Sequence, residues 1–120
     1  MLFDPPVYQI LGNAAAFCFG TLAQRSAHSL STIQSFLKIL PASCLVVFDV
    51  NLRQHYFTRE LIESSLEYAA ILKLHEEEFQ VISDMMEIKG SEEDRITCLF
   101  ANYHLHLIAL AKGPAGSLLY

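Results

Sequence analysis

The segment Val47-Phe48-Asp49-Val50-Asn51-Leu52-Arg53 joins the end of an apolar run to three polar side chains at every second position. The run begins at Cys44 and is rich in Val and Leu, as expected of a strand that is buried on both faces. In an open parallel sheet, ligands bind outside the carboxyl ends of the strands. The residues that follow Phe48 are therefore the first candidates for a functional site.

Three further apolar runs resemble this one in length and composition. Together the four runs predict strands at residues 14–19, 44–48, 70–74 and 105–110. Segments with helical spacing of apolar residues separate them, which is the pattern of βα units around a parallel sheet. The predicted fold class is α/β, a three-layer sandwich with a mainly parallel sheet. The 120 residues fit a single domain, 1–120, with one core.

Helices are expected between the strands. Apolar residues recur at helical spacing from Leu30 to Leu40, and Pro41 ends this helix because its ring cannot continue the hydrogen-bond ladder. Thr58 can cap a second helix. The buried stripe of that helix is expected to contain Ile62, Leu66 and Ala69.

Two more helices are expected in the second half of the chain. The third should begin near His75 or Glu76 and bury Phe79, Ile82 and Met86. The fourth should begin at Ser91-Glu92-Glu93-Asp94, which has the pattern of a capping box.

The two ends of the sequence differ in character. Asp4-Pro5-Pro6 predicts a turn or loop, whereas Ser117 to Tyr120 predicts an apolar strand after the turn at residues 113–116. A terminal apolar strand presents an unpaired edge unless another chain covers it. A homo-oligomer that forms through this sheet edge is therefore expected.

Composition excludes several classes of partner. The formal net charge is −5 and the basic residues are scattered, so neither a nucleic-acid interface nor nucleic acid as a partner is expected. No apolar run reaches the roughly 20 residues that span a bilayer, so no membrane partner is expected either. Cys18, Cys44 and Cys98 are widely spaced and are interpreted as reduced core residues. A cytoplasmic protein is the resulting expectation.

The polar residues after the second apolar run form a candidate anion site. On an extended segment Asp49, Asn51 and Arg53 would lie on one side, because side chains repeat every second residue. The guanidinium is a planar fork of donors that suits phosphate, and the carboxylate can fix the loop. The alternative is a local salt bridge that only shapes the loop.

The same residues carry a family resemblance. The segment 47–53 resembles the D-x-N-x-R element of ribokinase-like carbohydrate kinases, closest to bacterial fructokinase. Lys73-Leu74-His75-Glu76-Glu77-Glu78 is similar to that family's K-x-N-x-x-E element, and Ala111-Lys112-Gly113-Pro114-Ala115-Gly116 to its T-x-G-x-x-G nucleotide turn. Residues 17–25 resemble the strand and loop before the first helix of fructokinases. The four elements occur in the family's order, each at the end of a predicted strand.

The resemblance implies a site that binds ATP and Mg²⁺ and a small-molecule sugar. It assigns Asp49, Asn51 and Arg53 to substrate or phosphate. The nucleotide-binding residues that it implies are His75, Ala111, Lys112, Gly113 and Gly116, with Glu78 acting on magnesium indirectly. His75 and Ala111 replace the family's Asn and Thr. Loss of one hydroxyl contact weakens binding by about 0.5–1.5 kcal/mol.

The resemblance covers only the central part of that family. Its amino-terminal lid and most sugar contacts have no counterpart before Met1, and its G-A-G-D element, with the catalytic Asp, would lie beyond Tyr120. A positioned base contributes roughly 10²- to 10⁴-fold to such a reaction. This chain by itself is therefore expected to be inactive in phosphoryl transfer.

Two other functions fit parts of the pattern. A receiver domain would place its phosphoacceptor at Asp49, the end of one strand, and a lysine at Lys112, after a later strand. It also needs an acidic pair at the end of the first strand, where this sequence has Gly20-Thr21. The second alternative is a degenerate, non-enzymatic interaction module. Its support is a hydrophobic content of 52%, above the usual range of about 45–50%.

Overall fold

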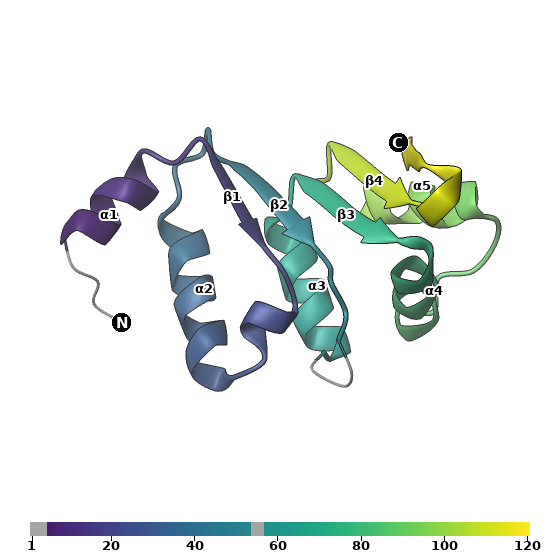
Figure 1. Cartoon of the computed structure of the whole chain (residues 1–120), viewed down its shortest axis with the longest axis horizontal. Coiled ribbons are helices and arrows are strands. Elements are labelled where there is room, and N and C mark those ends of the chain that lie inside the picture. Colours follow the sequence, from purple (N-terminus) through teal and green to yellow (C-terminus); the bar gives the residue numbers. More distant parts are fainter. Residues whose placement is uncertain (1–4, 54–56) are drawn as a thin grey trace.

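Four parallel strands and one antiparallel strand form the sheet of this protein, seen in a computed structural model that describes residues 5–53 and 57–120 (Figure 1). The elements are, in order, α1 (Pro5–Gly12), β1 (Ala16–Phe19), the 3₁₀ turn η1 (Leu22–Gln24), α2 (Ala27–Ile39), β2 (Leu45–Asp49), α3 (Arg59–Tyr68), β3 (Ile71–His75), α4 (Glu76–Met85), α5 (Glu92–Asn102), β4 (Leu107–Ala111), the 3₁₀ turn η2 (Gly113–Ala115) and β5 (Ser117–Leu119). The predicted α/β class and mainly parallel sheet are confirmed. The core helices cover one face of the sheet, so the described residues form two layers and not the three of the predicted sandwich.

The strand order follows the chain, β1-β2-β3-β4-β5, and only β5 runs antiparallel to its neighbour. Each connection between parallel strands moves to the next position in the sheet, always in the same sense. Because such crossovers are right-handed, their helices lie on the same face of the sheet. Helices α2, α3 and α4 accordingly lie on one side of the sheet in Figure 1. The buried Ile96 and Leu99 of α5 join the same core cluster.

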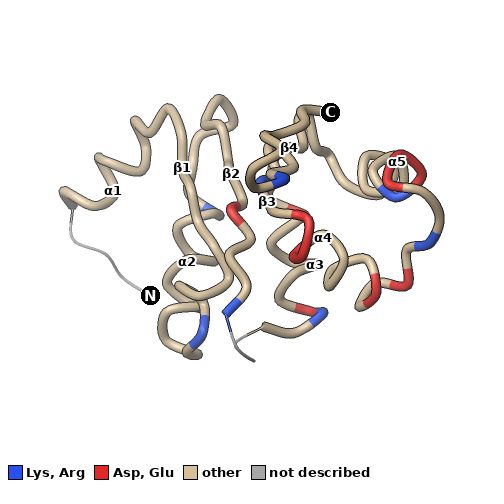
Figure 2. Tube along the Cα trace, turned by 45° about the vertical axis from the view of Figure 1, so that its right-hand side comes forward, with Lys and Arg blue, Asp and Glu red and all other residues tan. Residues whose placement is uncertain are grey.

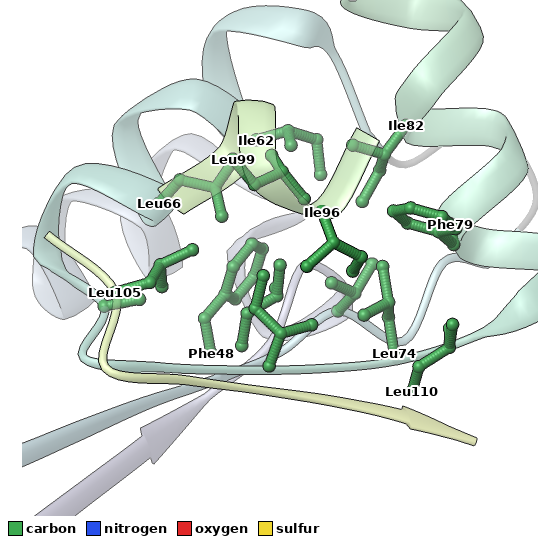
Figure 3. Packing of buried hydrophobic residues seen from close by; sticks show 14 of the residues in the cluster. Phe48, Ile62, Leu66, Leu74, Phe79, Ile82, Ile96, Leu99, Leu105 and Leu110 are labelled. Carbon is green, nitrogen blue, oxygen red and sulfur yellow. The ribbon is translucent and has the colours of Figure 1, made fainter. Parts of the chain in front are cut away.

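The core lies between this face of the sheet and the helices (Figure 3). Phe48, Leu72 and Ile108 are register partners on β2, β3 and β4, and each has 0% of its surface exposed. Leu66 from α3 and Ile82 from α4 cover this row. Burial of side chains of this size is worth about 1.5–3 kcal/mol each, so this row anchors the sheet.

The helix boundaries follow from capping residues. Thr58 accepts a hydrogen bond from the Leu61 amide, as predicted, and Ser91 and Asp94 form the predicted reciprocal capping box. Helix α2 ends at Ile39, before Pro41, and its first turn is capped by Ser26. No helix in the described part of the chain is long and apolar enough to cross a membrane.

The other face of the sheet has a different surface. Cys18, Val47, Ile71 and Leu107 are register partners across β1 to β4, and none of them is buried. The prediction that all three cysteines belong to the core is therefore wrong for Cys18. Its side chain alternates away from Phe17 and Phe19, which pack toward the helices.

The other two cysteines and the start of the described chain can also be compared with the predictions. Cys98 is half-buried and Cys44 is buried, and all three thiols are free. The predicted loop at residues 4–6 is wrong from Pro5 onward, because α1 begins there, whereas Asp4 lies outside the described residues. Proline is well suited to the first helical position, since its fixed φ is helical and its missing N–H would have no partner there.

Candidate functional site at the carboxyl edge of the sheet

The loops after β1 and β2 are joined by buried polar contacts. The Thr21 hydroxyl donates to the Val50 carbonyl at 2.6 Å and lies 2.9 Å from the Asn51 carbonyl, and this side chain has no exposed surface. Gly20 allows the approach, because a Cβ at this position would lie 2.6 Å from the Asp49 carbonyl oxygen. A larger residue would therefore push the end of β1 away from β2.

The buried Gln24 also stabilises the junction between the loops after β1 and β2. The Gln24 side-chain amide donates to the Gly20 carbonyl at 3.1 Å and to the Ser65 hydroxyl of α3 at 3.2 Å. Because buried amide groups need hydrogen-bond partners, these contacts hold η1 against α3 and fix the loop above it.

Glu78 joins the loop after β2 to the loop after β3. Its carboxylate accepts hydrogen bonds from the Leu52 amide at 2.7 Å and from the His75 amide at 3.0 Å, and the residue is 5% exposed. The His75 imidazole lies 3.6 Å from the same carboxylate. Both carboxylate oxygens are thus occupied by the protein, which suits a residue that positions loops more than a direct metal ligand.

The polar residues after β2 do not lie on one side of an extended segment, as the sequence pattern predicted. Asn51 has φ +47°, in the left-handed region, so the segment is not extended and the alternation prediction is wrong. Asp49 instead faces Lys73 of β3, with 3.4 Å between Oδ2 and Nζ, while Arg53 is exposed at the end of the described segment. Asn tolerates this backbone conformation better than most residues.

A hollow of about 410 Å³, the first hollow, lies at the ends of β1 and β2. Its polar lining comes from Arg25, Asp49 and Asn51, and Cys18 and Gly20 form part of its wall. An acid, an amide and a guanidinium do meet here, although the guanidinium is that of Arg25. Arg25 belongs to the segment 17–25 that resembles fructokinases. It follows a 3₁₀ turn, so no helical or strand period in the sequence indicated its role.

A second hollow, of about 450 Å³, lies at the ends of β3 and β4. It is lined by His75, Glu76, Glu77 and the segment 111–114. The adjoining hairpin turn is closed by the Lys112 amide, which donates to the Gly116 carbonyl at 2.7 Å. Gly113 and Gly116 have φ of +56° and +95°, which explains glycine at these two positions of the turn.

Lys112 is held by a surface network instead of facing the second hollow freely. Its ammonium group donates to both carboxylate oxygens of Glu92 at 2.9 and 3.0 Å, and the Tyr120 hydroxyl donates to the same carboxylate. These hydrogen bonds, first from Tyr120 and then from Lys112, lower the pKa of Glu92. In turn, the hydrogen bond to Glu92 raises the pKa of Tyr120 to about 12.

The structure brings most of the predicted site residues to one edge of the sheet. Asp49 and Asn51 line the first hollow; His75, Ala111, Lys112 and Gly113 line the second, and Glu78 connects the loops between them. Arg53 lies on the loop after β2 and lines neither hollow. Sequence reasoning placed Thr21 at a strand end, Arg25 in the segment 17–25 and Glu92 in a capping box. It missed their contacts in the site, because these join residues that are 28 to 30 positions apart or lie outside any helical or strand period.

The residues present fit a nucleotide better than a resident metal ion. The second hollow has a volume within the roughly 300–1,000 Å³ of small-molecule sites, with an apolar wall at Ala111 and Pro114. Acidic residues gather in the first turns of α4 and α5, as Figure 2 shows. Within residues 5–53 and 57–120, no three His, Cys, Asp or Glu residues are grouped to hold a metal ion.

A third hollow, of about 490 Å³, lies away from the strand ends. It is lined by residues of α3, of the segment 86–89 after α4 and of the end of α5, among them Glu63, Glu67 and Tyr103 just after α5. Burial and these two carboxylates raise the pKa of Tyr103. The lining of this hollow holds three acids, Glu63, Glu67 and Glu87, and two bases, of which Arg59 pairs with Glu63 at 2.8 Å and Lys89 lies on the segment after α4.

The fold is shared with solved sugar kinases. An uncharacterised sugar kinase from Pyrococcus horikoshii, in complex with ATP, is 28% identical with a TM-score of 0.74, and the match covers 94% of this chain and 35% of that one. Fructokinase from Xylella fastidiosa with bound ATP is 16% identical with a TM-score of 0.78 over 98% of this chain and 38% of that one. Fructokinase from Vibrio cholerae O395, bound to fructose, ADP and calcium ion, is 19% identical with a TM-score of 0.73, and the match covers 91% of this chain and 36% of that one.

This chain thus has the fold of one part of these kinases and spans about a third of their length. No protein-family model matches the sequence, and neither does any curated protein. The partial ribokinase-like fold that the motifs implied is confirmed by the structural neighbours.

Proposed function

We propose that this chain provides the nucleotide- and phosphoryl-facing loops of a fructokinase-like sugar kinase, which transfers the γ-phosphoryl group of ATP to a sugar hydroxyl. The observation that carries the proposal is the junction at Glu78, which holds the loops after β2 and β3 together at the carboxyl edge of the sheet. The strand pairing of His75 with Ala111 extends this edge to the nucleotide-like turn. Neighbours with the same fold contain ATP or ADP at 16–28% identity.

The two hollows suit different parts of the reaction. The second hollow would take the nucleoside part of ATP against Ala111, Gly113 and Pro114, with Gly116 shaping the turn. The first hollow would face the sugar and the transferred phosphoryl group through Asp49, Asn51 and Arg25, with Arg53 on the same loop. Such transfer depends on positioning and charge stabilisation, and bound Mg²⁺ would neutralise phosphate charge.

This chain by itself is proposed to bind nucleotide without turnover. Its sequence contains no G-A-G-D element that could place a general base beside the sugar hydroxyl. Sugar and ATP are its proposed small-molecule partners, and the cytoplasm, where ATP is available, is its proposed location.

The test is a titration of the ¹⁵N-labelled chain with ATP and Mg²⁺, followed by NMR. Amide shifts are expected at Ala111, Lys112 and Gly113, at Ala115 and Gly116, at His75 and at Asn51, with none at Asn102, which lines the third hollow. Saturating ATP that perturbs none of the strand-end loops, or only the third hollow, would contradict the proposal.

Two variants that restore the family's residues sharpen this test. Next to the second hollow, His75→Asn exchanges an imidazole for a smaller amide with one acceptor and two donor hydrogens, and Ala111→Thr adds a hydroxyl. Each should tighten ATP binding by roughly 2- to 10-fold, the equivalent of one hydrogen bond. The matched control is His106→Asn, an exposed substitution in the loop before β4, at the opposite end of that strand, which should leave the affinity unchanged.

The receiver alternative is not favoured by the fold. Receiver domains have the strand order 2-1-3-4-5 with parallel strands, whereas this sheet has the order 1-2-3-4-5 with β5 antiparallel. Lys112 also pairs with Glu92 instead of Asp49.

A further inference from the structure

The charged residues that line the second hollow are mostly acids. Glu76 and Glu77, in the first turn of α4, are both exposed. Among the residues that the structure describes, Lys112 is the one lysine or arginine of this lining. Carboxylates repel phosphate groups, which carry the same sign of charge. Whether this hollow can hold a phosphate therefore depends on Lys112.

The ammonium group of Lys112 is already paired with Glu92 of α5. It donates to both carboxylate oxygens, at 2.9 and 3.0 Å, and the two side chains are only 23% and 28% exposed. Charge-assisted hydrogen bonds of this length are stronger than neutral ones, and partial burial reduces their screening by salt. The Tyr120 hydroxyl donates to the same carboxylate and holds it in place. A phosphate would therefore have to compete with a carboxylate that is already bound to Lys112.

The backbone of the adjoining turn is also poorly suited to an anion. The amides of Lys112, Ala115 and Gly116 donate to carbonyl groups within the turn, at 2.7, 3.1 and 3.0 Å. Pro114 has no N–H to donate. Loops that bind phosphate through their backbone aim several free amides at the ligand, whereas this turn uses its amides to close on itself. Neither the side chains nor the backbone here thus provide a phosphate site.

The same lining suits an uncharged ring compound. Ala111 and Pro114 form an apolar wall, and the carboxylates of Glu76 and Glu77 can accept hydrogen bonds from hydroxyl or amino groups. Small-molecule sites commonly combine an apolar lining with a few such polar groups. A nucleoside has this chemistry, because its base carries an amino group and its ribose carries hydroxyls. Phosphates would then be left to bases outside this hollow, such as Arg25 in the first hollow.

We propose that Glu92 is a positioning residue that sets the charge preference of the second hollow. By pairing with Lys112, it keeps phosphate groups out of this hollow, which then takes the uncharged nucleoside part of a nucleotide. Glu92 acts through Lys112 and not by touching the ligand. The inference rests on the proposed function for its choice of a nucleotide as ligand, but the exclusion of anions by Glu92 can be measured without a nucleotide.

The first experiment compares two probes on the ¹⁵N-labelled 120-residue chain by NMR. Inorganic tripolyphosphate represents the charged part of a nucleotide, and adenosine represents the uncharged part. Adenosine is expected to shift the amides of Ala111, Lys112 and Gly113, because it enters the second hollow. Tripolyphosphate is expected to leave these three amides unshifted, and any binding to Arg25 or Arg53 would appear at the loops after β1 and β2 instead.

The second experiment repeats both titrations on Glu92→Gln. The uncharged amide no longer neutralises Lys112, so tripolyphosphate should now shift the amides of Ala111, Lys112 and Gly113. Its affinity at these amides should rise at least roughly fivefold, the effect of one charge pair in water, and the gain should shrink as salt is added. The affinity for adenosine should stay within about twofold, because an uncharged ligand does not respond to the released charge.

Two further variants separate the pairing of Glu92 from a general change of charge. Glu93→Gln is the matched control, since it removes the same charge from an exposed neighbour in the same turn of α5 and leaves the pair of Lys112 and Glu92 intact. It should not admit tripolyphosphate. The double variant E92Q/K112Q also removes the released ammonium group, so the gain should disappear. The dispersion of each NMR spectrum checks that the fold is retained.

Three results would overturn the inference. Tripolyphosphate could shift the amides of residues 111–113 equally in the unchanged chain and in E92Q, or E93Q could share the gain. E92Q could also change the affinity for adenosine as much as that for tripolyphosphate, which would indicate a loosened turn. Finally, ATP could shift these amides while adenosine does not, which would leave the proposed function standing. Failure of the proposed function is distinct, because ATP would then perturb none of the strand-end loops, whether or not E92Q gains tripolyphosphate binding.

Discussion

The two hollows at the carboxyl edge of the sheet are held in place by different forces. The first hollow depends on buried and steric contacts: Gly20 lies against the Asp49 carbonyl, and Thr21 donates to the next strand without any exposed surface. The second hollow depends on partly exposed charges, in which Glu92 holds Lys112 and Tyr120. The first should therefore be the more rigid and the less sensitive to pH and salt, and the second adjustable by both.

The contrast fits the proposed division of labour between the two sites. A site that faces the transferred phosphoryl group needs fixed positions, because small displacements weaken catalysis strongly. A nucleotide turn can tolerate a softer attachment, since it binds and releases its ligand. Four measurements test whether the two hollows differ in this way.

The largest effect is expected for Gly20→Ala. The new Cβ would lie 2.6 Å from the Asp49 carbonyl oxygen, so the end of β1 must move away from β2. The free energy of unfolding should fall by about 3 kcal/mol, the upper part of the range for overpacking. Urea unfolding measures it. Gly12→Ala is the control, since a Cβ there meets nothing within 4 Å.

Thr21→Val should have the next largest effect. Valine keeps the shape of the side chain but removes the hydroxyl that donates to the Val50 carbonyl. A loss of about 1–2 kcal/mol in the free energy of unfolding is expected, because a buried acceptor loses one of its partners. An unchanged stability in thermal or urea unfolding would show that the first hollow does not depend on this buried contact.

Glu78→Gln tests the connection between the two hollows. The amide keeps one oxygen as acceptor but loses the negative charge and the second acceptor, so one of the amides of Leu52 and His75 loses its partner. Stability should fall by about 1 kcal/mol. Hydrogen exchange of these two amides should accelerate, while exchange at Leu110 in the core strand should stay slow; equal acceleration everywhere would mean global destabilisation instead.

The smallest effect is a pH dependence confined to the second hollow. The folded-state pKa of Glu92 is lowered, so its contribution to stability is present above the unfolded pKa and lost as pH falls through the folded value. The pKa of Tyr120 is raised to about 12, so its contribution is present below about 10 and lost as pH rises through 12. Absorbance titration should show late ionisation of Tyr120 and of Tyr103, whose pKa values are both raised, and Glu92→Gln should remove the delay of Tyr120 alone.

Much of the fold could be predicted because its signals are local. The strands at residues 44–48 and 70–74, the Thr58 cap and the capping box at Ser91 all depend on residues within a few positions of each other. Prediction failed where a local pattern had two meanings. Pro5 can begin a helix as well as a loop, and an alternating polar segment such as residues 49–53 can turn through a left-handed Asn51.

The candidate site was predictable as a set of strand ends but not as a set of contacts. Parallel strands bring their carboxyl ends to one edge, so Asp49, His75 and Ala111 could be placed together from sequence. The role of Arg25 in the first hollow and the capture of Lys112 by Glu92 could not, because each depends on the path of a loop.

The sequence alone determined the α/β class, the order of strands and helices along the chain and the residues at each strand end, because hydrophobic period and capping are short-range properties. Only the tertiary structure determined that the strands pair in chain order, that the helices therefore gather on one face and that Cys18, Val47 and Ile71 are left uncovered on the other. Strand pairing joins residues about 24 to 36 positions apart, and a side chain that alternates to one face carries no local signal of what covers that face.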